Sequence, residues 1–270
     1  MTTEFVPDGP AASLVEPLSE AEGPVYVTDA DAESVEQLIE AVEGEADLPE
    51  LRVLGVGEEL RKVRRNFLLA SRAADLVDAG AMSFRTRTPT NNSTALIARD
   101  RVLLPVQVET ETGLVVTEGE GFTAGAYDWC ERNWETAEPF DLHTPPLSSI
   151  RETMAAEFDP DAQADFDRVL DTTADARDRS ELDEVMAALL VAAKHELLHY
   201  DVSKWGEDIG LASKATFSRK KGTLEEMDVV TTSKEIAEMG RPRQRLSLTD
   251  TYREEIERNG LSSLVNNIVY

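Results

Sequence analysis

The sequence predicts two fold classes in one chain: an α/β domain with a helix-covered sheet, then a C-terminal winged helix-turn-helix. Short apolar strands alternate with helical periodicity over residues 24–140. Three short helical segments and a β-hairpin pattern occupy residues 185–249. The chain has 53 acidic and 27 basic side chains, a net charge of −26, and many of its basic residues gather near the C-terminal hairpin.

The N-terminal pattern opens as strand, helix, strand, helix. We expect strands at residues 24–28 and 51–56 and helices at residues 32–42 and 58–79. Four more strands and a short aromatic helix follow, at residues 82–87, 93–98, 102–108, 113–118 and 127–134. A βαβα opening followed by a meander implies a sheet that is covered by helices. Core or interface packing is expected for the aromatic residues Phe122, Tyr127, Trp129, Trp134 and Phe140.

These patterns divide the chain into five segments. Residues 1–20 are expected to be a flexible tail, residues 21–145 an effector and dimerisation domain, residues 146–180 a helical linker, residues 181–250 the winged helix-turn-helix, and residues 251–270 a helix with an apolar tail. An apolar C-terminus needs burial, so we expect residues 261–269 to pack on the other domain or on a second subunit.

The helix-turn-helix is predicted from the order of its elements. Helices are expected at residues 185–198, 202–209 and 213–221, with a tight turn at Gly210-Leu211 between the second and the third. The hairpin strands are expected at residues 229–232 and 245–249.

Charge favours DNA as the partner of this region. Residues 211–245 carry eight basic and five acidic side chains, whereas DNA binding requires cations that displace counter-ions. At the start of the third helix, Ser213, Lys214, Ala215 and Thr216 are placed to reach base edges. The phosphate contacts and the rest of the predicted surface are Ser218, Arg219, Lys220, Lys221, Lys234, Arg241, Arg243 and Arg245. The alternative is a solvated helix face beside a charged edge hairpin.

A competing motif overlaps this region. His195-Glu196-Leu197-Leu198-His199 has the spacing of zinc metallopeptidases, in which two histidines share one helix face and the glutamate activates water. Glu225 or Glu226 would supply a third ligand. The alternative is a helix end, where a partly cationic histidine suits the helix dipole. Because these residues fall inside the helix-turn-helix pattern, we expect no metal and no catalytic residue.

The loop after residues 82–87 is rich in hydrogen-bond donors. It offers the candidate effector-binding residues Arg85, Arg87, Asn91, Asn92, Ser93 and Thr94, which suit a phosphate or polyhydroxyl ligand. A polar β-turn is the alternative. No glycine-rich phosphate loop follows a strand, so no cofactor is expected.

Composition also bears on the compartment. Cys130 is the only cysteine, which excludes internal disulfides and fits a reducing cytosol. No apolar run approaches the roughly 20 residues that span a bilayer, and the first residues are unlike a signal peptide. We therefore expect a cytoplasmic protein without membrane contact, and the acidity suggests a high-salt cytoplasm.

A family resemblance rests on residues 83–94, on Tyr127-Asp128-Trp129 and on the C-terminal pattern. Together they resemble the haloarchaeal TbsP-type transcriptional regulators, and in plan the archaeal TrmB-like sugar-responsive regulators, which join a phospholipase-D-like effector domain to a winged helix. The catalytic His-x-Lys-x-x-x-x-Asp motif of phospholipase D is missing, so the resemblance implies the fold without the catalysis. It also implies target genes of central carbon metabolism, including gluconeogenesis, and a sugar or sugar-phosphate effector.

The sequence thus predicts a non-enzymatic, sequence-specific regulator that binds double-stranded promoter DNA as a homodimer. Paired half-sites would enlarge the limited contact area of one such unit. The alternatives are the zinc peptidase and an interaction module that does not bind DNA.

Overall fold

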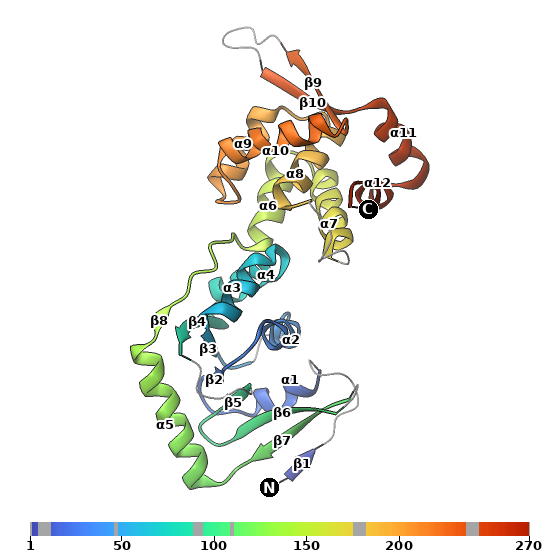
Figure 1. Ribbon diagram of the computed structural model, residues 1–270. Helices are drawn as coiled ribbons and strands as arrows, with labels where there is room; N and C mark the ends of the chain where they lie inside the picture. Colours follow the sequence, from blue (N-terminus) through green and yellow to red (C-terminus); the bar gives the residue numbers. More distant parts are fainter. Residues whose placement is uncertain are drawn as a thin grey trace. The chain divides into compact units, whose positions relative to one another are not determined.

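The computed structural model of the chain describes residues 2–4, 12–45, 48–88, 94–108, 111–174, 182–235 and 243–269. The chain forms two compact units, Met1–Pro146 and Leu147–Tyr270, which we call the N-terminal and C-terminal units (Figure 1). None of the helices in the described part of the chain is long and apolar enough to cross a membrane.

A mixed sheet forms the centre of the N-terminal unit. Its strand order among the described residues is β1-β7-β6-β5-β2-β3-β4-β8, and β2, β3 and β4 are parallel while the other neighbours are antiparallel. The strands are β1 Thr2–Glu4, β2 Val25–Thr28, β3 Leu51–Val56, β4 Met82–Arg87, β5 Ala95–Ile97, β6 Val102–Val108, β7 Glu111–Thr117 and β8 Glu138–Pro139. The predicted opening and meander are confirmed. The meander starts beside β2, not β4, because β5 pairs with the free edge of β2.

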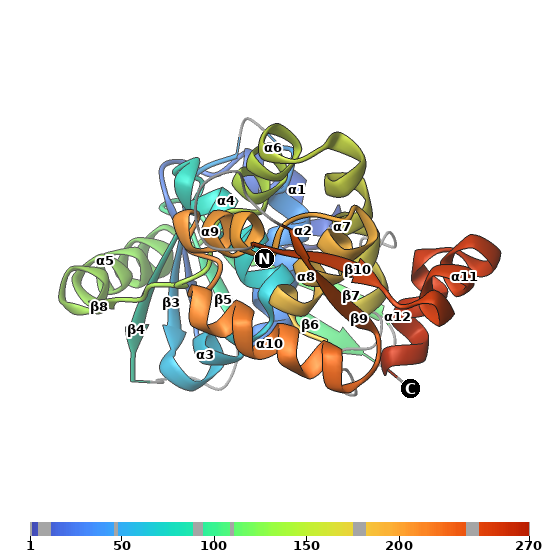
Figure 2. The same cartoon turned by 90° about the horizontal axis from the view of Figure 1, so that it is seen from above.

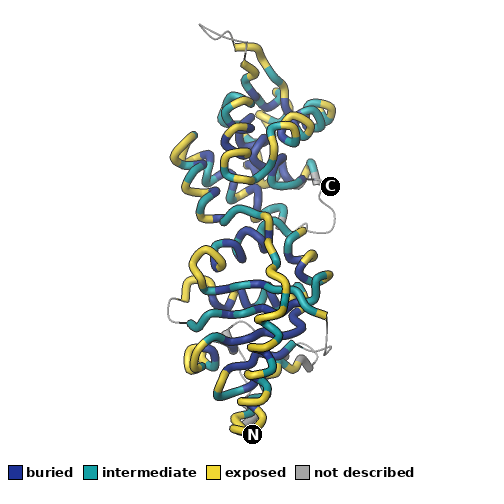
Figure 3. Tube along the Cα trace, turned by 90° about the vertical axis from the view of Figure 1, so that its left-hand side faces the viewer, coloured by how far each residue is buried: buried dark blue, intermediate teal, exposed yellow. Residues whose placement is uncertain are grey.

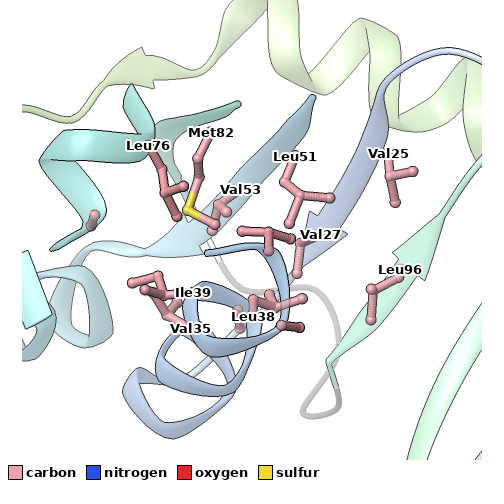
Figure 4. Packing of buried hydrophobic residues seen from close by; sticks show 14 of the residues in the cluster. Val25, Val27, Val35, Leu38, Ile39, Leu51, Val53, Leu76, Met82 and Leu96 are labelled. Atoms are coloured by element: carbon pink, nitrogen blue, oxygen red, sulfur yellow. The ribbon is translucent and has the colours of Figure 1, made fainter. Parts of the chain in front are cut away.

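Helices cover both faces of this sheet. They are α1 Ala12–Ser19, α2 Ala32–Val42, α3 Gly57–Arg65, α4 Phe67–Asp78 and α5 Glu120–Thr136. One face packs Val25, Val27 and Leu51 against α2 and α4 (Figure 4). The opposite face packs Tyr26 and Leu54 against α5. Period-2 alternation along each strand produces this two-sided core.

Two predictions for this unit are wrong. The expected single helix at 58–79 is two helices, because Asn66 ends α3 and its side chain caps α4 by accepting a hydrogen bond from the Leu69 N–H at 3.3 Å. Part of the expected tail at 1–20 is the helix α1, which buries Leu14 and Leu18 in the core. The phospholipase-D-like assignment stays a prediction.

The C-terminal unit contains the predicted winged helix-turn-helix. Its elements are α6 Leu147–Glu157, α7 Pro160–Ala174, α8 Glu184–Lys194, α9 His199–Asp208, α10 Lys214–Glu226, β9 Val230–Glu235, β10 Arg243–Leu248, α11 Asp250–Asn259 and α12 Leu261–Val269. The helix α8 is buried along residues 185–193, so the other elements pack around it. In Figure 2, α9 lies beside β10, and α10 also contacts β9. Figure 3 shows the buried stretches inside each unit and exposed ones at its surface.

The structure also changes the roles of two segments in this unit. Residues 146–180 were expected to be a linker, but α6 and α7 pack on each other and α7 packs on α8 and α12. The apolar C-terminal helix was expected to cover another domain or subunit. Leu261, Leu264 and Val265 are instead buried in their own unit, where α12 packs on α7.

Candidate nucleic-acid interface

The helix α10 has one buried and one exposed face. Phe217 and Leu224 are buried, whereas Ala215, Ser218 and Arg219 are exposed. Helical periodicity explains the division, because residues three and four apart share a face. The side chains that can meet a ligand from outside therefore include Ala215, Ser218 and Arg219.

The first two predicted base-reading hydroxyls are used inside the protein. Ser213 is the N-cap of α10, and its Oγ accepts a hydrogen bond from the Thr216 N–H at 3.2 Å. The two hydroxyls are also 3.1 Å apart. Such a cap stabilises a helix by about 1 kcal/mol. Ser213 and Thr216 thus position the start of α10.

Two residues that the sequence analysis did not single out hold α9 in place. A Cβ added at Gly206 would lie 2.3 Å from the Phe217 ring, so only glycine allows α10 to pack this closely on α9. The Trp205 indole is buried, and its Nε1 donates to Thr153 Oγ1 on α6 at 3.0 Å. A glycine within a helical pattern was the available signal, since it lowers helix propensity unless packing requires it.

Every lysine near α10 on which the DNA prediction relied, except Lys234, contacts a carboxylate. Lys214 pairs with Glu207 at 2.6 Å and Lys220 pairs with Asp183 at 2.5 Å. Lys221 is buried, with its Nζ 3.2 Å from Glu225. The prediction that Lys221 reaches a phosphate is therefore wrong, because this ammonium also donates to Gln244 Oε1 at 3.1 Å and joins α10 to the hairpin.

The hairpin arginines are also paired. Arg243 lies 3.4 Å from Asp201 and stacks over the Tyr200 ring at 5.0 Å. Arg245 pairs with Glu235 at 2.5 Å and also donates to the Glu196 carbonyl oxygen. Arg241 lies outside the described residues. Within the described part of this surface, only Arg219 and Lys234 have no carboxylate partner, so most of the predicted DNA-contacting cations are held in ion pairs.

The base of the hairpin is fixed on the domain. Leu246 and Leu248 are buried, and the Leu246 N–H donates to the Leu197 carbonyl oxygen at 2.9 Å. Leu198 also forms an isolated antiparallel bridge with Arg245. The segment that contains the histidine motif thus pairs, through Leu197 and Leu198, with the strand β10 of the hairpin.

This geometry contradicts the premise of the zinc-peptidase alternative. His195 is the C-cap of α8, Glu196 has φ 51°, and His199 begins α9, so the two histidines do not share a helix face. The alternative interpretation, a partly cationic histidine at the C-terminal end of a helix, fits the position of His195 at the end of α8. It does not fit His199, which begins α9 and whose pKa is lowered by burial, so that its neutral form is favoured. Among the described residues, no group of three metal-ligating side chains is arranged to hold an ion.

His195 belongs to a charged cluster around Asp165 of α7. The Asp165 carboxylate lies 2.7 Å from His195 Nε2 and 2.5 Å from Arg168 Nη1, and it accepts from Lys194 Nζ. Burial would raise the pKa of this carboxyl, but the hydrogen bonds from Lys194 and His195 outweigh burial and lower it. The cluster therefore joins α7 to the end of α8.

The candidate effector residues are divided in the structure. Arg85 Nη1 donates to the Trp134 carbonyl oxygen at 2.6 Å, and its guanidinium lies 4.8 Å from the Trp134 ring. Arg87 is buried 3.9 Å from Asp29 and lies 4.7 Å from the Trp129 ring. The structure thus brings both arginines to α5.

The remaining candidate effector residues are mostly outside the described part of the chain. Asn91, Asn92 and Ser93 lie outside the described residues. Thr94 is described, and its Oγ1 lies 3.1 Å from Ser34 Oγ, at the first turn of α2. An open cavity of about 430 Å³ borders the end of β4, and its lining includes Gly57, Thr86, Arg87, Thr88 and Asn133.

Aromatic side chains of α5 explain why these arginines are held there. Arg52 lies 5.7 Å from the Tyr26 ring and 5.8 Å from Trp134, and Arg99 lies 4.7 Å from Tyr127. Guanidinium groups over aromatic faces are favourable, most of all when desolvated. We call Arg52, Arg85, Arg87 and Arg99 with these rings the arginine–aromatic layer. Phe122 lies outside the layer and is 63% exposed, so it is not part of the core, and its predicted interface role stays a prediction.

Comparison with known proteins identifies both units. Residues 5–145 match the family model "Transcriptional regulator TbsP-like, N-terminal", and residues 146–267 match "Transcriptional regulator TbsP-like, C-terminal HTH domain". No curated protein matches the sequence. A solved structure described as "TrmBL2, an archaeal chromatin protein" with "a novel mode of DNA binding" aligns at 19% identity, over 52% of this chain and 54% of that one. Its TM-score of 0.34 is too low to assign a fold. The two family matches together show that the chain belongs to the TbsP-like transcriptional regulators and is a DNA-binding regulator with a C-terminal helix-turn-helix domain.

Proposed function

We propose that the chain recognises specific promoter sequences by placing α10 in the major groove. The observation that carries this proposal is the exposed face of α10, opposite the buried Phe217 and Leu224. Ala215 and Ser218 are small and lie near the start of the helix, where side chains of recognition helices reach base edges. Arg219 is exposed one residue further along and suits a phosphate contact.

The hairpin completes the proposed contact. Lys234 is exposed on β9, and Arg243 and Arg245 lie on β10 at the end of the strand pair near the loop. Cations at the tip of a wing can enter the minor groove, where the potential is most negative. Arg241 is proposed as a further contact from the sequence alone.

A homodimer is the proposed binding form. One small helix-and-wing unit has limited area for specificity, whereas two copies read paired half-sites. The resemblance stated above also motivates genes of central carbon metabolism, gluconeogenesis among them, as the targets.

The proposed effector is a sugar phosphate bound at the end of β4. The cavity there has a volume typical of small-ligand sites, and Thr86, Arg87 and Thr88 are among the residues that line it. Arg85 is not proposed to contact the effector, because its donor already binds the Trp134 carbonyl oxygen.

DNA binding is tested by a genome-wide binding profile of the wild type and of Lys214→Ala/Arg219→Ala/Arg243→Ala. We expect discrete promoter peaks that the triple variant loses. The control Lys62→Ala/Arg65→Ala/Arg258→Ala removes the same charge at exposed positions outside α10 and the hairpin, and it keeps the peaks. Retained peaks in the first variant would contradict the docking surface.

The effector proposal is tested separately by thermal unfolding with glucose 6-phosphate and with fructose 1,6-bisphosphate. We expect at least one of them to raise the midpoint of the wild type, and Thr88→Val to reduce the rise. Thr172→Val, an exposed hydroxyl replacement in the C-terminal unit, serves as the control. A rise that Thr88→Val leaves unchanged would place the ligand elsewhere, and the absence of any rise would remove these two effectors.

A further inference from the structure

The ion pairs of the DNA-facing surface share one arrangement. Each pair joins two elements of the C-terminal unit, and the acid comes from a position beside the proposed contact. The pairs are Lys214 of α10 with Glu207 of α9, Lys220 of α10 with Asp183 at the start of α8, Arg243 of β10 with Asp201 of α9, and Arg245 of β10 with Glu235 of β9. We call these acids the four carboxylates.

The four carboxylates remain open to solvent. Their side chains are between 33% and 46% exposed. Exposed ion pairs of this kind contribute little to the stability of the fold. A phosphate can therefore replace the carboxylate at small cost, in contrast to the Asp165 carboxylate, whose side chain is 2% exposed.

When a phosphate of DNA replaces the carboxylate as the partner of a basic side chain, the net number of cations released on binding changes. A free lysine or arginine that reaches a phosphate releases about 0.9 counter-ion from DNA. A paired cation releases the same ion but leaves its own carboxylate unneutralised beside the DNA. That carboxylate must then gain a cation from solution, because the neighbouring polyanion and the chain's net charge of −26 both disfavour a bare negative charge.

We propose that the four carboxylates are built-in counter-ions, so that DNA binding by this surface takes up monovalent cations and releases few. The inference rests on the proposed DNA contact. Among the described residues of α10 and the hairpin, six cations are exposed or partly exposed, namely the four paired ones with Arg219 and Lys234. Six unpaired cations would give a slope of log K against log salt of about −5. With four of them balanced internally, the slope is about −2.

This device gives the protein two properties. Affinity for DNA falls little as salt rises, because binding involves little net ion release. Attraction to arbitrary DNA at low salt is also weak, because the carboxylates offset the cations at long range. Base-edge contacts from the exposed face of α10 then account for a larger share of the binding energy.

The test is fluorescence anisotropy of the full-length protein with a labelled duplex of random sequence, titrated over a series of KCl concentrations. The test variant Asp201→Asn/Glu207→Gln/Glu235→Gln removes three of the four carboxylates and keeps similar side-chain shapes. Asp183 is left in place because it caps α8 by accepting from the Met186 N–H at 2.9 Å. The control variant Glu152→Gln/Glu254→Gln/Glu257→Gln removes the same charge from exposed positions on α6 and α11.

We expect a wild-type slope of about −2 and a slope of about −4.5 for the test variant, in which five cations are unpaired and Lys220 keeps Asp183. The test variant binds more tightly than the wild type at low salt, and the control variant keeps the wild-type slope. Equal slopes for wild type and test variant, with clear binding by both, would overturn the counter-ion role and leave the DNA contact intact. A control variant as steep as the test variant would also overturn it. Absence of binding by every protein at low salt would overturn the proposed function itself.

Discussion

Basic side chains differ between the two units in their partners and in their exposure to solvent. In the N-terminal unit, Arg52, Arg85 and Arg87 lie over aromatic rings, and Arg85 is also bound by the Trp134 carbonyl oxygen. In the C-terminal unit, Lys214 and Arg243 are exposed and paired with exposed carboxylates. Aromatic rings and partly or fully buried partners hold the first group, including Glu50 for Arg52 and Asp29 for Arg87. The second group is held by exposed charges that another anion can replace.

Whether a cluster of basic residues can bind an external anion therefore depends on the partners of those residues. Residues 84–94 and 213–221 both read as donor-rich in the sequence. In the second, Arg219 is exposed and the paired cations can change partners, because an exposed ion pair is weak and exchanges easily. In the first, Arg85 and Arg87 are held at α5. Availability for binding therefore depends on burial and on partner type, and both are tertiary properties.

The largest expected effect is from Asp165→Ala. This change leaves Lys194 and His195 without their carboxylate at a site where Asp165 is 2% exposed, so we expect a loss of about 3 kcal/mol in unfolding free energy. Chemical denaturation measures it. Glu207→Gln instead removes the charge of an exposed carboxylate but keeps an acceptor for the Lys214 N–H, and it leaves the midpoint nearly unchanged. Equal losses in the two variants would erase the distinction between fixed and exchangeable pairs.

The pH dependence of stability also distinguishes the buried Asp165 carboxylate from the exposed carboxylates. Because the folded pKa of Asp165 is lowered, its contribution is complete above its unfolded pKa of about 4 and is lost as pH falls through the folded value. Acid titration of unfolding free energy should therefore show a steeper decline below pH about 4 for the wild type than for Asp165→Ala. Parallel curves would contradict the assignment.

A smaller loss is expected from Arg85→Ala. The variant loses a charged hydrogen bond to the Trp134 carbonyl oxygen and the contact with its ring, together about 2 kcal/mol. Arg219→Ala, at an exposed position of α10, should leave the unfolding midpoint unchanged and weaken DNA binding. The comparison of the two regions breaks if Arg85→Ala weakens DNA binding without loss of stability.

The smallest effect concerns Cys130, on the buried side of α5. Burial raises the pKa of this thiol to about 12, so it is neither ionised nor accessible at neutral pH. We expect no labelling by a thiol reagent in the folded protein, with or without DNA, and complete labelling after denaturation. Rapid labelling of the native chain would show that α5 opens and that the arginine–aromatic layer is not fixed.

Local periodicity was enough to predict most of the elements. The strand at residues 51–56 and the helix at 32–42 have the bounds that their apolar spacing indicates, and the helix-turn-helix order was also predicted. The break at Asn66 was missed because the apolar pattern continues across it, whereas the cap that makes it depends on one side-chain hydrogen bond.

The candidate site was less predictable than the fold. The third helix and the hairpin were identified, but their partners Asp201 and Glu207 lie on another helix, and no local pattern reveals such pairs. The interpretation of residues 195–199 as a zinc motif was wrong for a similar reason. A left-handed Glu196 separates two helices where spacing alone indicated one.

The most direct test follows the arginine side-chain Nε–Hε signals of the ¹⁵N-labelled full-length protein by NMR while duplex DNA is added. The account predicts that the signals of Arg219, Arg243 and Arg245 shift, whereas those of Arg52, Arg85 and Arg87 stay unchanged. Shifts confined to the arginines of the N-terminal unit, with Arg219 and Arg243 unaffected, would contradict it.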